Sequence, residues 1–211
     1  EARVDRQSLD GFVTAFQSVR HLSIGELWAV SAMLRLALIE SVRRMTLRTV
    51  QRMDHIEKAD GWAARIASAA EQGEAPLASA LDAFVRSHPQ LTAAFVSRLL
   101  HQLRLIVGSY PILAHIEQWI SDRSLGAEDA NARATQHLAL TQVIMAHSIT
   151  SLRTIAHLDW PSFVDGQSAM EPVLREDPAG FYGWMTFGTR DRYRHVVERI
   201  ARRTGMGEEA V

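Results

Sequence analysis

The 211 residues are 47% apolar and 22% charged, which is the balance of a folded globular protein and excludes a disordered chain. The 23 basic and 24 acidic residues leave a net charge of -1, so no overall field directs the chain to nucleic acid or to an anionic membrane. Only local patches could do so, and we expect no nucleic-acid partner. The absence of cysteine excludes disulfides, thiolate catalysis and zinc–thiolate sites. The best apolar run, Leu27 to Ile39, is interrupted by Ser31 and Arg35 and is too short to span a membrane.

Helix is the expected structure throughout. Only 12 Gly and 6 Pro punctuate the sequence, and β-branched residues form no alternating runs. We therefore predict an all-α fold, a multi-helix bundle with two long helices and several shorter ones. It is treated as a single domain over residues 1–211, with a possible subdivision near 59–146. The chain lacks an initial Met, and residues 207–211 resemble the first turn of another helix, so we expect a segment of a longer protein.

The first two helices are predicted from apolar spacing and a capping sequence. A helix over residues 8–19 is expected to place Phe12, Phe16 and Val19 on one face. Ser23 and Glu26 have the spacing of a capping box, which predicts the start of a long helix of about 30 residues, to residue 61. Its apolar stripe comprises Leu27, Leu34, Leu38, Val42 and Met45.

Shorter helices are expected to follow over 61–70 and 76–86, and a further one is expected to begin at Pro89, which suits the first helical position. A break is predicted over 107–111, a helix over 111–120 and a turn over 121–126. The second long helix is predicted over 127–155. The apolar residues that it offers for burial are Leu138, Val143, Ile144, Ile149 and Leu152.

The C-terminal part carries strong helix punctuation. Asp159 can cap a helix that Pro172 should kink or shorten. We expect an irregular linker over 181–188. The last helix is predicted from a Thr189 cap to about residue 203, with Gly205 as its C-terminal stop.

Motifs that carry catalytic chemistry are missing from the sequence. It contains no H-E-x-x-H, no G-x-S-x-G, no Gly-rich phosphate loop and no Asp-x-Asp pair of the kind that holds a cation in nucleotide-sugar transferases. The nearest metal-like cluster, residues 54–57 around His55, is better interpreted as a solvated helix end. We therefore predict no catalytic residue, no metal ligand and no cofactor in this chain.

Two basic groups are candidate interaction surfaces. Arg44, Arg48 and Arg52 recur every four residues, which predicts a cationic stripe that could contact anionic phospholipid or an acidic partner. An ordinary solvated face, with Glu40 paired to Arg44, explains the same pattern. The same alternatives apply to the second group, which comprises Arg190, Arg192, Arg194, Arg199, Arg202 and Arg203.

Aromatic residues are densest near the C-terminus, where Tyr182, Trp184 and Tyr193 lie close to Phe181 and Phe187. Aromatic faces stack on sugar rings, so one interpretation is a glucan-binding surface. The other is that a linker between helices needs aromatic side chains to hold it against the core.

Two stretches resemble a known family, the cyclic β-1,2-glucan synthases of the NdvB type. The matching strings lie in the same order over residues 12–19, 22–30 and 33–40, and over 147–153, 159–160, 174–180 and 189–201. Two departures are Ser31, where the family favours Pro, and Gly188, where it has Ala. The middle of the chain, roughly 59–146, carries no such match.

The resemblance implies a place and a role. Such sequence lies in the N-terminal part of these synthases, on the cytoplasmic side of the bacterial inner membrane, ahead of the membrane spans and the glycosyltransferase domain that uses UDP-glucose. We expect a non-catalytic scaffold or docking domain whose partners are other domains of the same synthase. The alternative is a membrane-surface or glucan-binding module that uses the Arg44 stripe or the aromatic cluster. Attachment of the glucan primer to Tyr110, Tyr182 or Tyr193 is a weaker hypothesis, because nothing nearby in the sequence activates a phenol.

Overall fold

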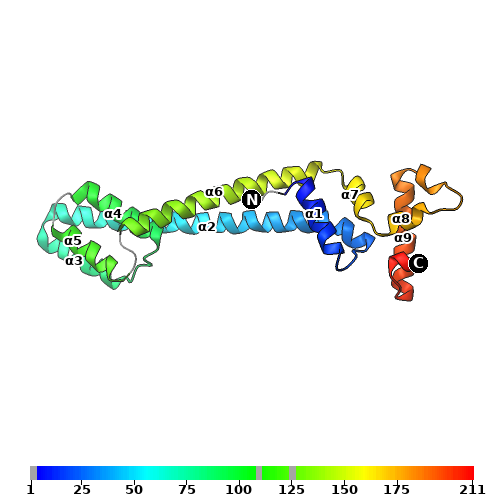
Figure 1. The fold of residues 1–211 in the computed structure, drawn as a ribbon. Helices are drawn as coiled ribbons and strands as arrows, with labels where there is room; N and C mark the ends of the chain where they lie inside the picture. Colours follow the sequence, from blue (N-terminus) through cyan, green and yellow to red (C-terminus); the bar gives the residue numbers. More distant parts are fainter. Residues whose placement is uncertain (1–3, 108–110, 124–126) are drawn as a thin grey trace. The chain divides into compact units, whose positions relative to one another are not determined.

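The fold is all-α over residues 4–107, 111–123 and 127–211, which are the residues that the computed structural model describes (Figure 1). Two helices are long, α2 (Ile24–Gln72) and α6 (Ala127–His157), as predicted. The shorter α-helices are α1 (Arg6–Gln17), α3 (Glu74–Arg86), α4 (Ala93–Val107), α5 (Pro111–Ser121), α7 (Trp160–Gln167), α8 (Met170–Arg175) and α9 (Phe187–Thr204). Two short 3-10 helices, η1 (Tyr182–Trp184) and η2 (Glu208–Ala210), complete the described elements. Within these ranges no helix has the length and hydropathy needed to cross a membrane.

The chain divides into two compact units, each with its own hydrophobic core. Unit one is Glu1–Val42 with Ala146–Val211, and unit two is Arg43–Met145. The long helices α2 and α6 each contribute residues to both units. The two units are therefore described separately.

The start of α2 confirms the capping box. The Ser23 N–H donates to Glu26 Oε2 at 2.9 Å, and the Glu26 N–H donates to Ser23 Oγ at 3.3 Å. The helix then runs through Gly61 to Gln72, so the predicted end at residue 61 was wrong. A glycine inside a helix costs only about 1 kcal/mol, and burying the next turns, with Ala63 and Ile66, outweighs that cost.

The core of unit one joins α1, the start of α2, the end of α6, and α7. Leu9 and Val13 of α1 are buried there, whereas Phe12, Phe16 and Val19 are exposed, so the predicted inner face of α1 was wrong. Both faces of α1 carry apolar residues, and only contact with α7 decides which is buried. The other buried members of this core are Ile24, Leu27, Ile155, Trp160, Phe163, Val164 and Met170.

The C-terminal helices of unit one begin and end close to their predicted signals. Asp159 caps α7 by accepting the Ser162 N–H at 3.2 Å. Pro172 falls in the first turn of the separate helix α8, where a missing N–H is tolerated. The last helix begins at a Thr186 cap rather than at Thr189, and it ends at Gly205 in the left-handed conformation, with φ 72°. The start was therefore wrong by one turn and the stop was confirmed.

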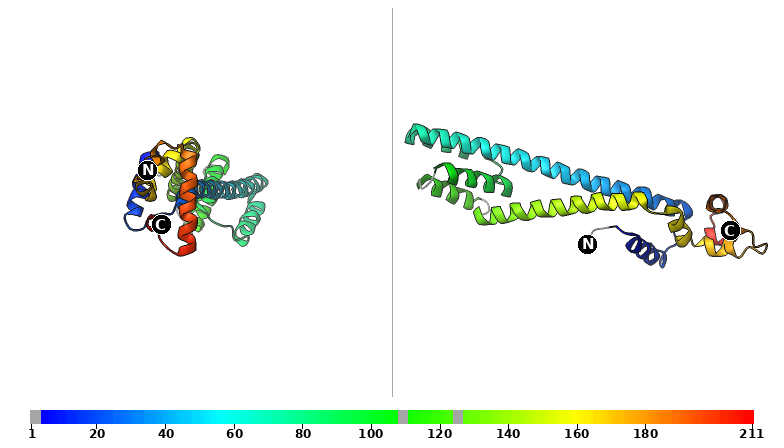
Figure 2. Two further views of the ribbon diagram at one scale, coloured as in Figure 1. Left: turned by 90° about the vertical axis from the view of Figure 1, so that its right-hand side faces the viewer. Right: turned by 90° about the horizontal axis from the view of Figure 1, so that it is seen from above.

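Unit two packs α3, α4, α5 and the start of α6 along the C-terminal part of α2 (Figure 2). Phe84 lies at its centre, with ring centroids 5.3 Å from Trp62 and 5.4 Å from Trp119. Pro89 precedes α4 and does not begin it, contrary to prediction. The helix starts after Thr92, whose backbone oxygen accepts the Val96 N–H at 2.9 Å.

Helix α6 confirms the second long helix, but not all of its expected buried face. Leu138, Val143 and Ile149 are exposed, while the fully buried positions are mostly small side chains. These buried residues are Ala130, Ala134, Ser148, Ser151 and Ile155. Small residues bring neighbouring helices close, which hydropathy alone does not indicate.

Candidate functional site

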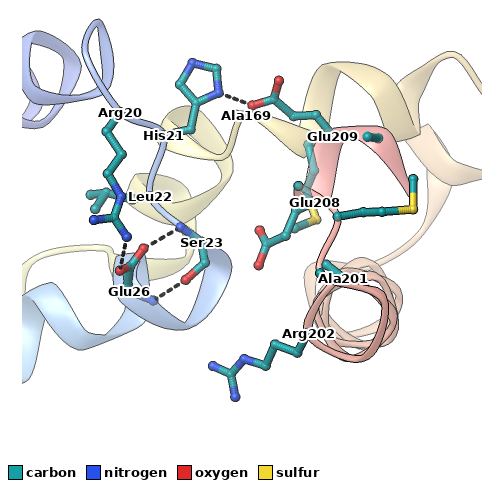
Figure 3. Close-up of a pocket in the computed structure, with 15 residues that line it drawn as sticks. Arg20, His21, Leu22, Ser23, Glu26, Ala169, Ala201, Arg202, Glu208 and Glu209 are labelled. Carbon is teal, nitrogen blue, oxygen red and sulfur yellow. Dashed lines mark hydrogen bonds and ion pairs between the residues drawn. The ribbon is translucent and has the colours of Figure 1, made fainter.

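A cleft of about 560 Å³ lies in unit one, between the start of α2, the end of α9 and η2 (Figure 3). Charged side chains line its rim, and Met170, Ala201 and Met206 contribute apolar surface. The sequence analysis did not find this cleft, because it joins residues near both ends of the chain.

One wall of the cleft is the capped start of α2. Hydrogen bonds from the backbone and hydroxyl of Ser23 hold the pKa of Glu26 below its ordinary value, with the charge of Arg20 adding to the effect. Arg20 Nη2 lies 3.6 Å from Glu26 Oε1. The carboxylate is thereby kept ionised at a helix N-terminus, where negative charge is favourable.

The opposite wall is the chain's last turn. The carboxylate of Glu208 accepts the Ile24 N–H at 3.1 Å, and so binds a second free amide at the start of α2. Burial raises the pKa of Glu208, although the Ile24 bond opposes it. Beside it, Glu209 pairs with the imidazole of His21 (Figure 3). These contacts hold η2 against the start of α2.

Close packing at the cleft depends on Gly25. A Cβ at this position would lie 2.7 Å from Glu198 Oε1 and 3.3 Å from Arg202 Nη2. Arg202 itself donates to Glu198 at 2.7 Å. The lack of a side chain therefore lets this ion pair of α9 lie across the start of α2.

The chemistry of the cleft is that of a structural junction. Each charged group of the cleft walls named above has a partner inside unit one and takes part in capping or ion pairing. These groups are Glu26, Glu208, Glu209 and Arg202. Among the described residues, no three His, Asp or Glu side chains gather in a way that could hold a metal ion.

The predicted arginine stripe follows one side of α2 and turns gradually around it. Four residues advance a helix by about 400°, so each arginine is turned about 40° from the one before. Arg44 and Arg48 are exposed, whereas Arg52 is half-buried and lines a second cleft, of about 430 Å³, in unit two. The three arginines thus spread over about 80° of the helix, and their contact with phospholipid or an acidic partner stays a prediction.

The second cleft is basic but largely neutralised. Arg98 donates two hydrogen bonds to Asp60, at 2.6 and 3.1 Å, which raise the pKa of Arg98 despite its desolvation. Arg104 likewise donates two to Glu117. Arg52 therefore lies beside arginines whose charges are already balanced.

The three predicted aromatic residues differ in exposure and in their contacts. Tyr182 is buried, and its hydroxyl donates to Glu171 Oε2 at 2.9 Å. Tyr193 is half-exposed and meets the Tyr182 ring edge-on, with centroids 6.4 Å apart. Trp184 is 91% exposed. The three do not combine into one stacking surface.

An ordered loop presents Trp184. Asp177 accepts the backbone N–H groups of Ala179, Phe181 and Tyr182 at 2.8 to 3.0 Å, and these bonds hold the pKa of Asp177 below its ordinary value. Gly180 supplies the left-handed turn, with φ 67°. The loop is thus stiffened from inside while Phe181 and Trp184 face outward.

A buried ion cluster in unit one was missed by the sequence analysis. Arg194 has no exposed surface and donates to Glu171 at 3.0 Å and to Asp165. Arg190 donates to the same two acids at 2.8 and 2.6 Å. Burial alone would raise the pKa of Glu171, but the bonds from Arg194 and Tyr182 and the charges of both arginines outweigh it and lower the pKa. The four-residue spacing of the arginines was visible, but not the acids that face them.

The fold and its two clefts define an all-α segment with structural ion pairs, and no protein-family model matches it. The chain is 30% identical over 210 residues to the cyclic beta-(1,2)-glucan synthase NdvB of Rhizobium meliloti (strain 1021). The match covers 99% of this chain and 7% of NdvB. The chain is thus related to a segment of that synthase, and the relationship includes the middle residues in which no resemblance was recognised.

Proposed function

We propose that this chain is a non-catalytic helical docking domain of a cyclic β-1,2-glucan synthase that polymerises glucose from UDP-glucose. The observation that carries the proposal is the relationship to NdvB along 99% of the chain. In this proposal the segment belongs to the N-terminal part of the synthase, on the cytoplasmic side of the inner membrane, as the sequence resemblance implies. Its partners are other domains of the same protein.

A surface suited to docking lies on the outer face of α2. In unit one, Met33, Leu36 and Ile39 are 55 to 65% exposed, on the side of the helix opposite the core residues. Unit two repeats the pattern with Leu47, Val50 and Met53. Clustered exposed apolar side chains of this kind mark contacts with another protein surface.

The test is a double substitution, Leu36→Glu with Ile39→Glu. Because both side chains face outward, the isolated chain should keep its helicity and melting temperature. In the full-length synthase the same pair should reduce cyclic glucan production and co-purification of the segment with the rest of the enzyme after limited proteolysis.

A matched control is Leu140→Glu with Val143→Glu, which changes two exposed apolar residues of α6. Equal loss of cyclic glucan in both double variants would contradict the assignment of the α2 face as the docking surface. Turnover of UDP-glucose by the isolated chain would refute the non-catalytic assignment itself.

Contact with the glucan is a second candidate function, favoured by the exposure of Trp184 on a stiffened loop. Stacking of an aromatic ring on a sugar needs an accessible face, which this side chain has. Titration calorimetry with linear β-1,2-glucan should give a heat of binding that Trp184→Ala abolishes and Phe12→Ala, an exposed aromatic on α1, retains. No heat with the unchanged chain would end this candidate.

The geometry also bears on the primer hypothesis. Burial, followed by the hydrogen bond to Glu171, raises the pKa of Tyr182 to about 12, which makes its phenol a poor nucleophile. Tyr193 remains accessible, and Tyr110 lies outside the described residues. Mass spectrometry of peptides from glucan-bearing synthase tests whether any of the three is linked to sugar.

A further inference from the structure

The outer face of α9 combines apolar and cationic side chains. Tyr193, Val196 and Ile200 are 42 to 50% exposed and follow one another at three- and four-residue spacing. The opposite side of the helix carries the buried Arg194 and Ala201. The exposed ridge therefore lies away from the core of unit one.

Arginines line one edge of this ridge. Arg192, Arg199 and Arg203 are exposed and fall on the same face by helical geometry. Among the described residues, none of the three has an acidic oxygen within 4.0 Å. The other arginines of α9 are paired, Arg190 and Arg194 in the buried cluster and Arg202 with Glu198.

No acidic side chain interrupts the face. The two acids of α9, Asp191 and Glu198, are only 20% and 12% exposed and engage His195 and the arginines of the inner side. The outer face thus carries a strip of three positive charges beside three apolar side chains, on a chain whose net charge is -1.

We infer that the outer face of α9 binds the surface of an anionic phospholipid bilayer. Lipid phosphates supply the missing negative charge, and arginine reaches them while its stem lies along apolar surface. Tyr193, Val196 and Ile200 then enter the boundary between headgroups and acyl chains, where tyrosine is favoured. The inference does not depend on the proposed relationship to glucan synthesis, and it assigns lipid contact to α9 instead of the Arg44 stripe.

The test uses the whole chain and two kinds of vesicle, phosphatidylcholine alone and phosphatidylcholine mixed with phosphatidylglycerol. We expect sedimentation with the mixed vesicles only, weakening as salt is raised. Each arginine near an anionic surface contributes about fivefold in affinity. Replacing Arg192, Arg199 and Arg203 with Gln should therefore weaken binding roughly a hundredfold. Val196→Ser with Ile200→Ser should weaken binding, but the dependence of binding on salt should stay unchanged.

The control variant replaces three exposed arginines elsewhere, Arg35, Arg133 and Arg153, with Gln, which changes net charge equally. An equal loss in the control would show that net charge, not this face, governs binding, and would overturn the inference. Equal binding to both kinds of vesicle would also overturn it. If the chain sedimented with neither kind of vesicle, lipid binding would be refuted, and an acidic protein would be the remaining partner for this face.

Discussion

Arg194 is the largest side chain in the described structure with no exposed surface. Removing a guanidinium from water costs several kcal/mol, so the charge persists only because Glu171, Asp165 and the Tyr182 hydroxyl surround it in unit one. The shared carboxylate of Glu171 joins α8, η1 and α9. Glu171 is therefore the acid that Arg190, Arg194 and Tyr182 share.

Glu171→Gln is expected to destabilise unit one by about 3 kcal/mol or more, because it leaves two buried arginines under-compensated. Urea unfolding followed by circular dichroism measures the change. The lowered pKa of Glu171 means that its contribution is present above the unfolded-state pKa and is lost as pH falls through the folded-state pKa. The difference in unfolding free energy between the unchanged chain and the variant should therefore become smaller in acid. Glu176→Gln, an exposed neighbour, should change stability little, and an equal effect would contradict the assignment.

Glu208 should give a pH dependence of stability opposite to that of Glu171. Because burial raises its pKa, ionisation of Glu208 costs stability as pH rises through the folded-state value. Glu208→Gln keeps an acceptor for the Ile24 N–H without the buried charge, so it should raise the melting temperature at neutral pH and lose that advantage in acid. Glu208→Ala removes the cap and should cost about 1 kcal/mol. Identical melting curves for both variants would argue against capping.

Among the helix elements, three local capping signals were confirmed, whereas the helix ends predicted at residue 61, Pro89 and Thr189 were wrong. Ser23, Asp159 and Gly205 act locally, through bonds to the next few amides, and each was confirmed. The inner face of α1 was wrong because it depends on α7, about 150 residues further along the chain.

The site was less predictable than the fold. The aromatic group mixed a buried Tyr182 with an exposed Trp184, and the arginine stripe, whose contact with a partner stays a prediction, includes the half-buried Arg52. The cleft at the start of α2 and the ion cluster around Arg194 need pairs of residues distant in sequence. No pattern in a single sequence indicates which distant acids meet which arginines.

Two glycines give a paired prediction on helix structure. Gly61 lies inside α2 with nothing within 4 Å of an added Cβ, so Gly61→Ala should stabilise the chain by about 1 kcal/mol. Gly205 closes α9 with φ 72°, so the same substitution there should destabilise it by about 1 kcal/mol. Thermal unfolding of both variants measures whether each substitution raises or lowers stability. Destabilisation by Gly61→Ala would mean that α2 does not continue through this residue.

The two hydrophobic cores share no buried residue. One gathers Phe84, Phe95 and Leu99 in unit two, and the other gathers Leu27, Phe163 and Val164 in unit one. Each core contains aromatic and aliphatic side chains from several helices, so each unit has its own source of hydrophobic stabilisation.

Phe84→Ala should cost about 4 kcal/mol, since it opens a cavity among Trp62, Phe95 and Trp119. Hydrogen exchange should accelerate most for amides of residues 43–145, and less in the rest of the chain. The reciprocal variant, Phe163→Ala, should affect unit one most. Uniform acceleration in both variants would show that the chain unfolds as a single cooperative body.

The bond from Glu208 to Ile24 makes the stability of the longest helix depend on the chain's last four residues. A protease cut before Glu208 would remove this carboxylate and let the first turn of α2 fray. Engineering of this segment should therefore leave residues 208–211 intact and place labels elsewhere.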